Sequence, residues 1–358
     1  MSIRGGQIMK SDELRGKLQE IQELALRENI DIGADIDRLN RKLATGDEDA
    51  WRRVELARHQ ERPTTLELIR LMSERFIELH GDRNFGDDPA LAGGIATIGG
   101  IHFTFLGHQK GRNMKENLRR NFGMAHPEGY RKALRLAQQA ERFGRPVLTL
   151  IDTPGAFPGL AAEERGIGEA IARNLRDFSV LRTPIICVVI GEGGSGGALG
   201  IGVGDRVYMM ENAVYSVISP EGFASILLRD AKKARQAAGL MKMTAPDLNR
   251  FGIIDGIIDE PGNGAHTDHH GTAMAIKYQV MQAYGELSRK RPDQLLDDRS
   301  ARILSLGRFA GGSEPRPRGF LGRLFPRLNS LVGQPRRQSR GQVNDAGKLG
   351  NPGKGDDR

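Results

Sequence analysis

The sequence is poor in the features that mark secreted proteins, membrane proteins and zinc proteins. Among 358 residues there is one cysteine, Cys187, which can form neither an internal disulfide bond nor a zinc site made of cysteines. No stretch approaches the ~18 consecutive apolar residues of a transmembrane helix. The start, MSIRGGQIMK, has no apolar core of the kind found in secretion signals. We therefore expect a cytoplasmic protein without a transmembrane segment.

Charge is distributed unevenly along the chain. Lys and Arg number 53 against 45 Asp and Glu, which gives a net charge of +8. Residues 301–358 hold 12 basic and 4 acidic residues and carry the whole excess, so the body gives no overall sign of nucleic-acid binding. One local basic stretch, residues 109–145, contains ten basic and three acidic residues. This stretch is either a solvated helix face or a surface that faces anions such as phosphates.

Composition and periodicity divide the chain into three predicted regions. Residues 1–62 are expected to form a helical extension, because apolar residues such as Leu14, Leu18 and Ile21 recur among charged ones at helical spacing. Residues 63–300 are expected to form the main domain. Residues 301–358 are expected to be a basic, disordered tail, since residues 310–358 contain ten Gly and five Pro. Within this tail, Gly319–Gly333 is apolar and basic and could instead fold on a partner or on an acidic membrane.

The main domain shows short runs of branched apolar residues that alternate with helical patterns. Buried strands are predicted at Gly94–Ile98, Ile101–Leu106, Pro146–Ile151, Pro184–Ile190, Val207–Met210, Val214–Ile218 and Ile253–Ile258. Helices are predicted from Pro63, with Leu66, Ile69, Met72 and Phe76 on the apolar side, and over Pro127–Phe143, Ala162–Val180 and Asp268–Arg289. The alternation of strands and helices predicts an α/β fold.

Glycine is abundant, at 47 residues or about 13% against a usual ~7%. Its densest cluster, Gly191–Gly200 (GEGGSGGALG), follows a predicted strand and leads into small residues that can begin a helix. A segment without side chains lets backbone N–H groups reach a ligand oxygen, and such donors can stabilise an oxyanion by ~3–4 kcal/mol each. The alternative is a glycine segment that serves only close packing.

Two further interpretations of this segment involve side chains. Gly191, Gly193 and Gly196 fit the dinucleotide-binding pattern G-x-G-x-x-G, with Glu211 twenty residues after the first glycine. However, nine residues, Gly197–Asp205, separate the last glycine of this pattern, Gly196, from the next strand, whereas a crossover with its helix needs ~10–12. Alternatively, Ser195 is the centre of G-x-S-x-G, with Asp255 and His266 following in the order found in hydrolases. Neighbouring glycines alone would produce this second match.

Other loops also leave the ends of predicted strands. Asp152–Leu160 (DTPGAFPGL) contains two Pro-Gly pairs, and Phe157 and Leu160 could supply an apolar wall for a ligand. Ser216–Gly222 is a strand end followed by a helix start at Pro220. His266, Asp268, His269 and His270 lie close together in the sequence, but their loop of Gly, Asn and Asp is typical of a surface loop and no metal is expected there.

Eight segments in order resemble the alpha subunit of the bacterial acetyl-coenzyme A carboxylase carboxyltransferase. They are GHQKGR (107–112), RRNFGM (119–124), PEGYRKALRL (127–136), IDTPGAFPG (151–159), AEERG (162–166), EAIARNL (169–175), IGEGGSGGALGIGVGD (190–205) and YSVISPEG (215–222). LARH (56–59) and Asp82 extend the resemblance, which covers roughly residues 30–290. Each motif is weak alone, but eight in the same order are highly specific.

The resemblance implies a crotonase-like fold, a spiral of strand-strand-helix units, that pairs with a zinc-ribbon beta subunit to form a shared active site. It implies transfer of a carboxyl group from carboxybiotin, held by a separate carrier protein, to acetyl-coenzyme A, which gives malonyl-coenzyme A, the first committed step of fatty acid synthesis. It also implies an α2β2 heterotetramer in a complex with the biotin carboxyl carrier protein and biotin carboxylase. ATP would serve only the biotin carboxylase step, and no P-loop is present here.

By the same resemblance, the backbone N–H groups of Gly196 and Gly197 form an oxyanion hole for the biotin ureido oxygen. Substrate-binding roles are expected for Phe157, Pro158, Gly159, Gly193, Gly194, Lys110 and Arg112. A hypothesis of a different class also stands. The chain could be a binding subunit that presents its N-terminal helices and basic tail, with a purely structural glycine segment.

Overall fold

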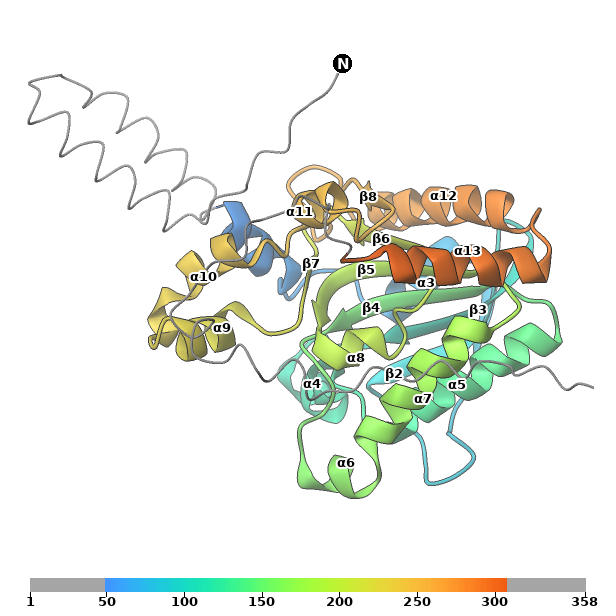
Figure 1. Cartoon of the computed structure of the whole chain (residues 1–358), viewed down its shortest axis with the longest axis horizontal. Helices are drawn as coiled ribbons and strands as arrows, with labels where there is room; N and C mark the ends of the chain where they lie inside the picture. Colours follow the sequence, from blue (N-terminus) through green and yellow to red (C-terminus); the bar gives the residue numbers. More distant parts are fainter. Residues whose placement is uncertain (1–48, 308–358) are drawn as a thin grey trace, which may run out of the picture. The chain divides into compact units, whose positions relative to one another are not determined.

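The computed structural model describes residues 49–307 (Figure 1). The predicted helices over residues 10–48 and the predicted tail from Arg308 onward lie outside these residues. The domain boundaries at residues 62 and 300 stay predictions. No helix within residues 49–307 is long and apolar enough to cross a membrane.

One sheet of eight strands forms the centre of the described residues. The strands are β1 (Arg75–Glu78), β2 (Leu91–Ile98), β3 (Ile101–His108), β4 (Val147–Thr153), β5 (Ile185–Gly194), β6 (Arg206–Met210), β7 (Val214–Ser216) and β8 (Gly256–Ile258). Their order is β1-β2-β3-β4-β5-β6-β8, and β7 pairs with the end of β5. The pairs from β1 to β3 are antiparallel, whereas those from β3 onward are parallel. The carboxyl ends of β4 and β5 therefore lie side by side, where ligand sites of α/β proteins are commonly found.

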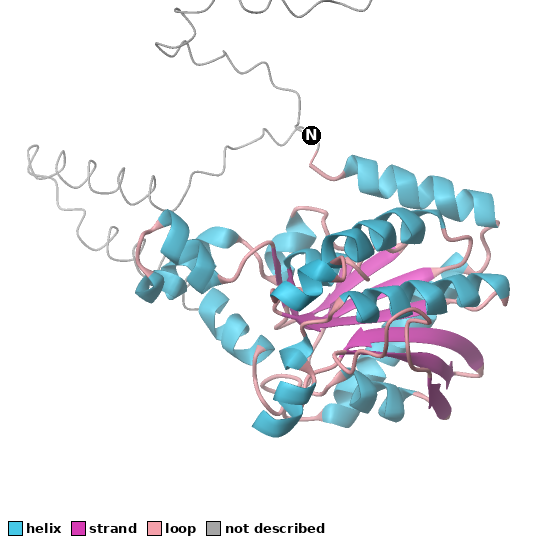
Figure 2. Ribbon diagram, turned by 90° about the horizontal axis from the view of Figure 1, so that it is seen from below, coloured by secondary structure: helices cyan, strands magenta, loops and turns pink. Residues whose placement is uncertain are grey.

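Helices pack on both sides of this sheet (Figure 2). After a helix over residues 49–57, they are α3 (Thr65–Met72), α4 (Met114–Arg119), α5 (Pro127–Arg142), α6 (Leu160–Glu164), α7 (Ile167–Val180), α8 (Ser195–Leu199), α9 (Pro220–Leu227), α10 (Ala234–Met241), α11 (Ala245–Arg250), α12 (His269–Leu287) and α13 (Pro292–Ser305). Helix α5 packs against β2, β3 and α7, whereas α12 packs against α3, β5 and β8. Two short 3₁₀ turns cover Asn121–Gly123 and Ala231–Lys233.

The helix limits follow from local chemistry. Helix α5 begins with Pro127, a residue whose fixed φ suits the first helical position. Asp268 caps α12, since its side chain accepts the N–H of Gly271 at 2.8 Å. Helix α13 is fixed to the sheet by Arg299, which is 1% exposed and pairs with Asp205 at 2.8 Å. Most of the predicted strands and the predicted helices α5 and α12 are confirmed. Most of their observed ends lie within three residues of the predicted ends.

Several elements differ from the sequence prediction. The helix predicted from Pro63 ends at Met72, because Ser73 adopts an extended conformation. Phe76, expected on the apolar side of that helix, lies in β1, a strand that was not predicted. The single helix predicted over Ala162–Val180 is two helices, α6 and α7, because Gly166 takes a left-handed φ of 79° between them. Helices α4, α10, α11 and α13 were also not predicted, whereas the helix start predicted at Pro220 is confirmed as the start of α9.

A segment of α9 and α10 stands away from the sheet on the left of Figure 1. A small separate core ties it to the helix over residues 49–57. This core consists of Ala50, Val54, Ala57, Val214, Ala238 and Met243. The exposed side chains Ile226 (67%) and Leu227 (65%) of α9 have no cover among residues 49–307.

Candidate active site

The glycine segment is a strand end that passes directly into a helix. Strand β5 continues to Gly194, four residues beyond its predicted end, and pairs there with β4 and β7. Helix α8 then begins at Ser195, which has a φ of 50°. A left-handed φ is uncommon outside glycine, so the chain makes a sharp turn between strand and helix.

Two glycines of this segment pack backbone to backbone against the loop after β4. A Cβ atom on Gly194 would overlap the carbonyl of Pro154, and one on Gly197 would overlap the backbone of Gly155 and Ala156. Gly196 differs, since a Cβ atom there would have no heavy atom nearer than 3.9 Å. Close packing therefore requires glycine at positions 194 and 197, whereas a Cβ atom on Gly196 would make only ordinary contact with Ile171.

The first N–H groups of a helix have no acceptor within the helix. Among the described residues, the N–H groups of Gly196 and Gly197 are not paired with any backbone or side-chain acceptor. Gly197 is buried and Gly196 is half-buried. Two adjacent N–H donors without a protein acceptor can take the oxygen of a ligand.

The loop after β4 places the predicted apolar residues next to the glycine segment. The N–H of Phe157 donates to the carbonyl of Ala125 at 3.1 Å. Its ring lies against that of His126, with 4.2 Å between centroids. Phe157 and Gly159 are half-buried, and a Cβ atom on Gly159 would overlap the Phe157 ring. Pro158 is exposed. The binding roles of these three residues stay predictions.

A cluster of charges lies at the ends of the same two strands, β4 and β5. Nζ of Lys110 lies 2.7 Å from Asp152 Oδ1 and 3.0 Å from Glu192 Oε2. Arg58 pairs with Glu192 at 2.7 Å and with Glu221 of α9 at 2.7 Å. The Glu192 N–H also donates to Asp152 at 3.0 Å. This cluster connects the helix over residues 49–57, β4, β5 and α9.

The electrostatics of the cluster favour its charged forms. Burial opposes the charge of Lys110, but the carboxylates of Asp152 and Glu192 outweigh burial and raise the pKa of Lys110. Burial would raise the pKa of Glu192, but Lys110 and Arg58 hold that pKa below its ordinary value. A cavity of about 400 Å³ borders the cluster and is lined by Arg58, His59, Gln60, Arg62, Lys110 and Asp152, among others.

Most of the basic stretch over residues 109–145 binds the protein itself. Besides Lys110, Arg112 pairs with Glu67 and donates to the carbonyl of Arg62 at 3.1 Å. Arg131 pairs with Asp82 and Lys132 with Asp87. The functional interpretation of this stretch therefore depends on the few side chains without such partners. The binding roles of Lys110 and Arg112 stay predictions.

The geometry of the glycine segment matches neither a dinucleotide-binding loop nor the nucleophile site of a hydrolase. Gly191 and Gly193 belong to a paired strand, whereas a dinucleotide loop would need them in a turn. Within residues 49–307, Ser195 is exposed and has no hydrogen bond to a histidine or a carboxylate. Asp255 pairs instead with Arg302 at 3.0 Å. A serine nucleophile would need a base within hydrogen-bond reach.

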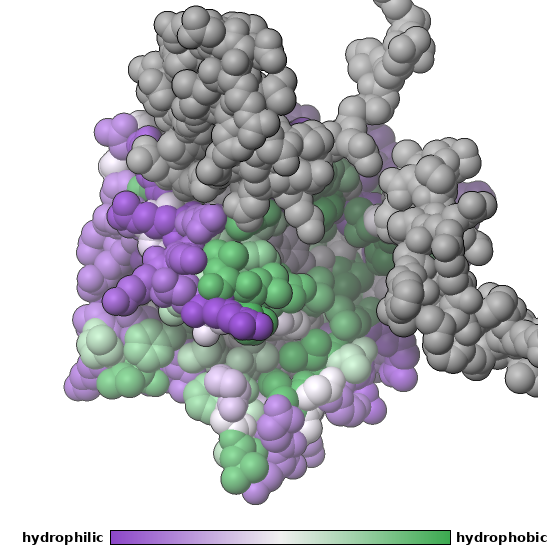
Figure 3. Space-filling model, turned by 60° about the vertical axis from the view of Figure 1, so that its left-hand side comes forward, coloured by the Kyte–Doolittle hydropathy of each residue, from purple (hydrophilic) through white to green (hydrophobic). Residues whose placement is uncertain are grey.

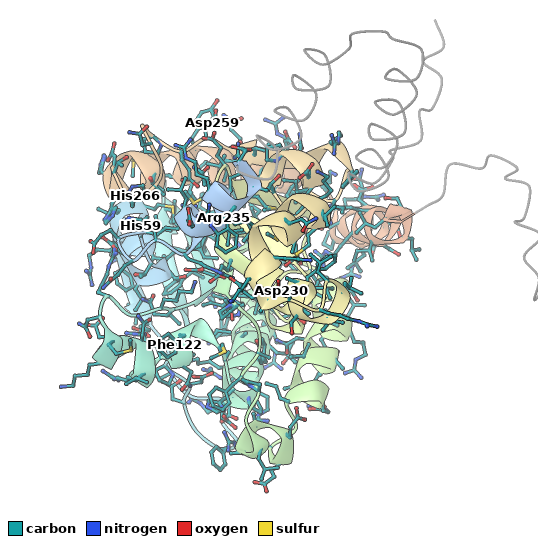
Figure 4. All side chains as sticks on the ribbon, turned by 90° about the vertical axis from the view of Figure 1, so that its left-hand side faces the viewer. His59, Phe122, Asp230, Arg235, Asp259 and His266 are labelled. Atoms are coloured by element: carbon teal, nitrogen blue, oxygen red, sulfur yellow. The ribbon has the colours of Figure 1, made fainter. Side chains whose placement is uncertain are left out.

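The loop rich in histidine binds other parts of the protein. His266 stacks on His59 with 4.0 Å between ring centroids, and Figure 4 shows the two side by side. His269 contacts Glu67 at 2.7 Å and the carbonyl of Glu61 at 2.7 Å. Residues 49–307 contain no group of three or more His, Cys, Asp or Glu side chains placed to hold a metal ion.

Comparison with known proteins decides the family. Residues 9–307 match the family described as "Acetyl co-enzyme A carboxylase carboxyltransferase-like". The "Acetyl-coenzyme A carboxylase carboxyl transferase subunit alpha" of Treponema denticola is 55% identical over 304 residues, which cover 84% of this chain and 100% of that protein. The chain belongs to this family.

Two solved structures share the fold of this carboxyltransferase family member. A transcarboxylase 12S structure with methylmalonyl-coenzyme A matches 63% of this chain and 41% of its own, with a TM-score of 0.52 and 20% identity. A Pseudomonas malonate decarboxylase hetero-tetramer with coenzyme A matches 66% of this chain and 96% of its own, with a TM-score of 0.52 and 18% identity. The crotonase-like α/β fold implied by the resemblance is confirmed.

Several residues around the site were not predicted, although they lie inside the motifs of this family. Tyr130 contacts the middle of α8, Asn174 contacts its C-terminal end, and His108 lies beside the Gly197 backbone. Asp152 and Glu192 form the charge cluster with Lys110. One sequence signal could have identified a residue such as Asn174. It is a polar residue at a position that helix periodicity assigns to the buried face.

Proposed function

We propose that this chain is the alpha half of a biotin-dependent carboxyltransferase that acts on acetyl-coenzyme A. In the reaction, the bond between the carboxyl carbon and N1 of biotin breaks. A carbon–carbon bond forms to the methyl carbon of the acetyl group, and a methyl proton moves to the biotin nitrogen. The product is malonyl-coenzyme A. Membership in the carboxyltransferase family makes carboxyl transfer the activity of this chain.

The single observation that carries the proposed role is the pair of N–H groups on Gly196 and Gly197. Negative charge develops on the ureido oxygen of biotin when its carboxyl group leaves. Two donors that are already in place stabilise such charge without reorganisation, and each is worth ~3–4 kcal/mol. The biotin nitrogen takes the proton, so this route requires no side-chain base from Ser195 or its surroundings.

The proposed partner is a zinc-ribbon beta subunit that supplies most of the acetyl-coenzyme A site. An apolar surface beside the candidate site supports this proposal. Figure 3 shows apolar side chains at the centre of the face near α9, bordered by polar ones. Val217, Ile226 and Leu227 are 79%, 67% and 65% exposed. Apolar surface gathered in this way is typical of a protein interface.

The remaining partners belong to the same proposal. A biotin carboxyl carrier protein would deliver carboxybiotin, and biotin carboxylase would use ATP to make it. The assembly would be an α2β2 heterotetramer in the cytoplasm. Phe157, Pro158, Gly159, Gly193 and Gly194 would line the biotin side of the site, and Lys110 and Arg112 would lie toward coenzyme A.

The reverse reaction tests this function. Malonyl-coenzyme A and a free biotin analogue are supplied to this chain alone, to a zinc-ribbon beta subunit alone and to the mixture. We expect loss of malonyl-coenzyme A only in the mixture and only with the biotin analogue present. A stable complex without this activity would contradict the proposal and favour a role as a binding subunit.

A further inference from the structure

Helix α8, which carries Gly197, is held at its middle by a buried tyrosine of α5. The hydroxyl of Tyr130 donates to the carbonyl of Gly197 at 3.2 Å. Tyr130 is 0% exposed. Burial, and then the charge of Asp88, raises its pKa, so that the hydroxyl stays protonated and remains a donor.

The end of α8 is held by a buried asparagine of α7. Nδ2 of Asn174 donates to the carbonyl of Gly200 at 2.8 Å and to the backbone carbonyl of Tyr130 at 3.0 Å. Asn174 is 1% exposed, and its Oδ1 has no partner among the described residues. One side chain therefore connects α5, α7 and the last turn of α8.

Gly200 transmits this restraint to the peptide that contains the Gly197 N–H. The N–H of Gly200 donates to the carbonyl of Gly196 at 2.9 Å. In a trans peptide the C=O and the N–H point in opposite directions, so fixing the Gly196 carbonyl also fixes the direction of the Gly197 N–H. The Tyr130 ring packs on Gly200 so closely that a Cβ atom there would lie 2.5 Å from Cε1.

We infer that Tyr130 and Asn174 are positioning residues that aim the Gly197 N–H at the reacting oxygen, an inference that rests on the proposed function. Neither side chain needs to touch substrate. Asn174 holds the Gly200 carbonyl by one hydrogen bond, and Tyr130 holds Gly200 by its ring and the Gly197 carbonyl by its hydroxyl. Donors of an oxyanion hole must match the position that the charged oxygen takes in the transition state.

The positioning role predicts a specific kinetic signature. A misaimed donor loses more in the transition state, where the oxygen is charged, than in the bound substrate, where it is neutral. The loss therefore falls on kcat, while KM changes little. A residue that only stabilised the fold would instead lower thermal stability or the yield of complex and leave the kcat of the folded enzyme unchanged.

The test uses the complex of this chain with its beta subunit in the reverse reaction. Asn174→Leu removes the donor to Gly200, and Tyr130→Phe removes the hydroxyl but keeps the ring. We expect kcat to fall about tenfold to hundredfold for Asn174→Leu and about fivefold to tenfold for Tyr130→Phe, with KM for the biotin analogue and malonyl-coenzyme A within about twofold. The double variant should lose less than the product of the two, because both act through α8.

Tyr208→Phe is the matched control, because Tyr208 is a buried tyrosine of β6 that does not contact α8. Its kcat should stay at the wild-type value. If Asn174→Leu does not fold, the kcat of Tyr130→Phe alone tests the inference. The inference would be overturned if a folded, assembled Tyr130→Phe complex kept the wild-type kcat. It would also be overturned if KM rose while kcat stayed constant. Absence of activity in the wild-type complex would instead overturn the proposed function.

Discussion

The α-carbon of Gly197 packs against the backbone nitrogen of Ala156 so closely that a Cβ atom on Gly197 would overlap it. This contact joins the glycine segment after β5 to the loop after β4. It means that the position of α8 depends on the loop that also carries Phe157. The two strand ends therefore act as one unit at the candidate site.

Gly197 and Gly196 provide a matched pair of substitutions. Gly197→Ala should lower the free energy of unfolding by ~1–3 kcal/mol, because overpacking displaces the backbone of Gly155 and Ala156. It should also lower carboxyl transfer strongly. Gly196→Ala should fold and assemble normally, since its Cβ atom makes only ordinary contact with Ile171 and alanine suits a helix better than glycine. Chemical denaturation of both variants checks this difference, and equal losses of stability would contradict it.

Ser195→Ala tests whether a side-chain nucleophile is used. Ser195 is exposed and has no base bound to it among the described residues, so we expect kcat of the reverse reaction within a few-fold of wild type. The measurement requires the assembled complex, with gel filtration to show that assembly is unchanged. A loss of a thousandfold or more in an intact complex would favour a serine hydrolase mechanism.

Lys110→Met separates a structural role from a binding role. Removal of the ammonium group leaves the negative charges of Asp152 and Glu192 close together with less positive charge beside them. The free energy of unfolding should therefore fall by ~2–4 kcal/mol. If Lys110 also binds the phosphates of coenzyme A, KM for malonyl-coenzyme A should rise in the folded variant. Lys115→Met, which removes an exposed lysine of α4, is the control. Unchanged stability of Lys110→Met would contradict the structural role.

Strands β2 to β8 and the glycine segment could be predicted from the sequence, because runs such as Pro184–Ile190 and the cluster around Gly196 are local signals. The extension of β5 to Gly194 could not be predicted, because it depends on pairing with Thr153 and Tyr215, which come from other parts of the chain. The break at Gly166 depends on a single left-handed residue within a helical pattern.

The candidate site, like the fold, could be predicted only in part from the sequence. The resemblance identified Gly196 and Gly197, while the contacts of Tyr130 and Asn174 appear only when α5, α7 and α8 come together. Lys110 was singled out for its charge, but its partners Asp152 and Glu192 lie on separate strands. Sequence spacing alone carries no information about such pairs.

His108 predicts a specific pH dependence of stability. It is fully buried, its ring nitrogens have no hydrogen-bond partner among residues 49–307, and burial, then the charge of Lys110, lowers its pKa from 6.5 to about 3. Between these two pH values the unfolded chain binds the proton and the folded chain does not, so stability falls as the pH decreases, by up to ~1.4 kcal/mol per pH unit from this group.

Comparison of variants isolates this contribution. His108→Leu should flatten the pH dependence of the free energy of unfolding between pH 6 and pH 4, because the group that takes up the proton on unfolding is gone. His102→Leu, which removes an exposed histidine of the same strand, should keep the wild-type slope. Identical slopes for wild type and His108→Leu would show that His108 is not held neutral by the fold.

The most direct test of the central claim removes the Gly197 N–H without adding a side chain. Replacement of Gly197 by glycolic acid exchanges the backbone N–H for an ester oxygen and adds no side chain, so the contact with Ala156 is kept. The same replacement at Gly100, in the β2–β3 turn, is the control. We predict that kcat of the reverse reaction falls about hundredfold for the Gly197 ester, with KM for the biotin analogue nearly unchanged. An assembled Gly197 ester complex that works at the wild-type rate would contradict the account.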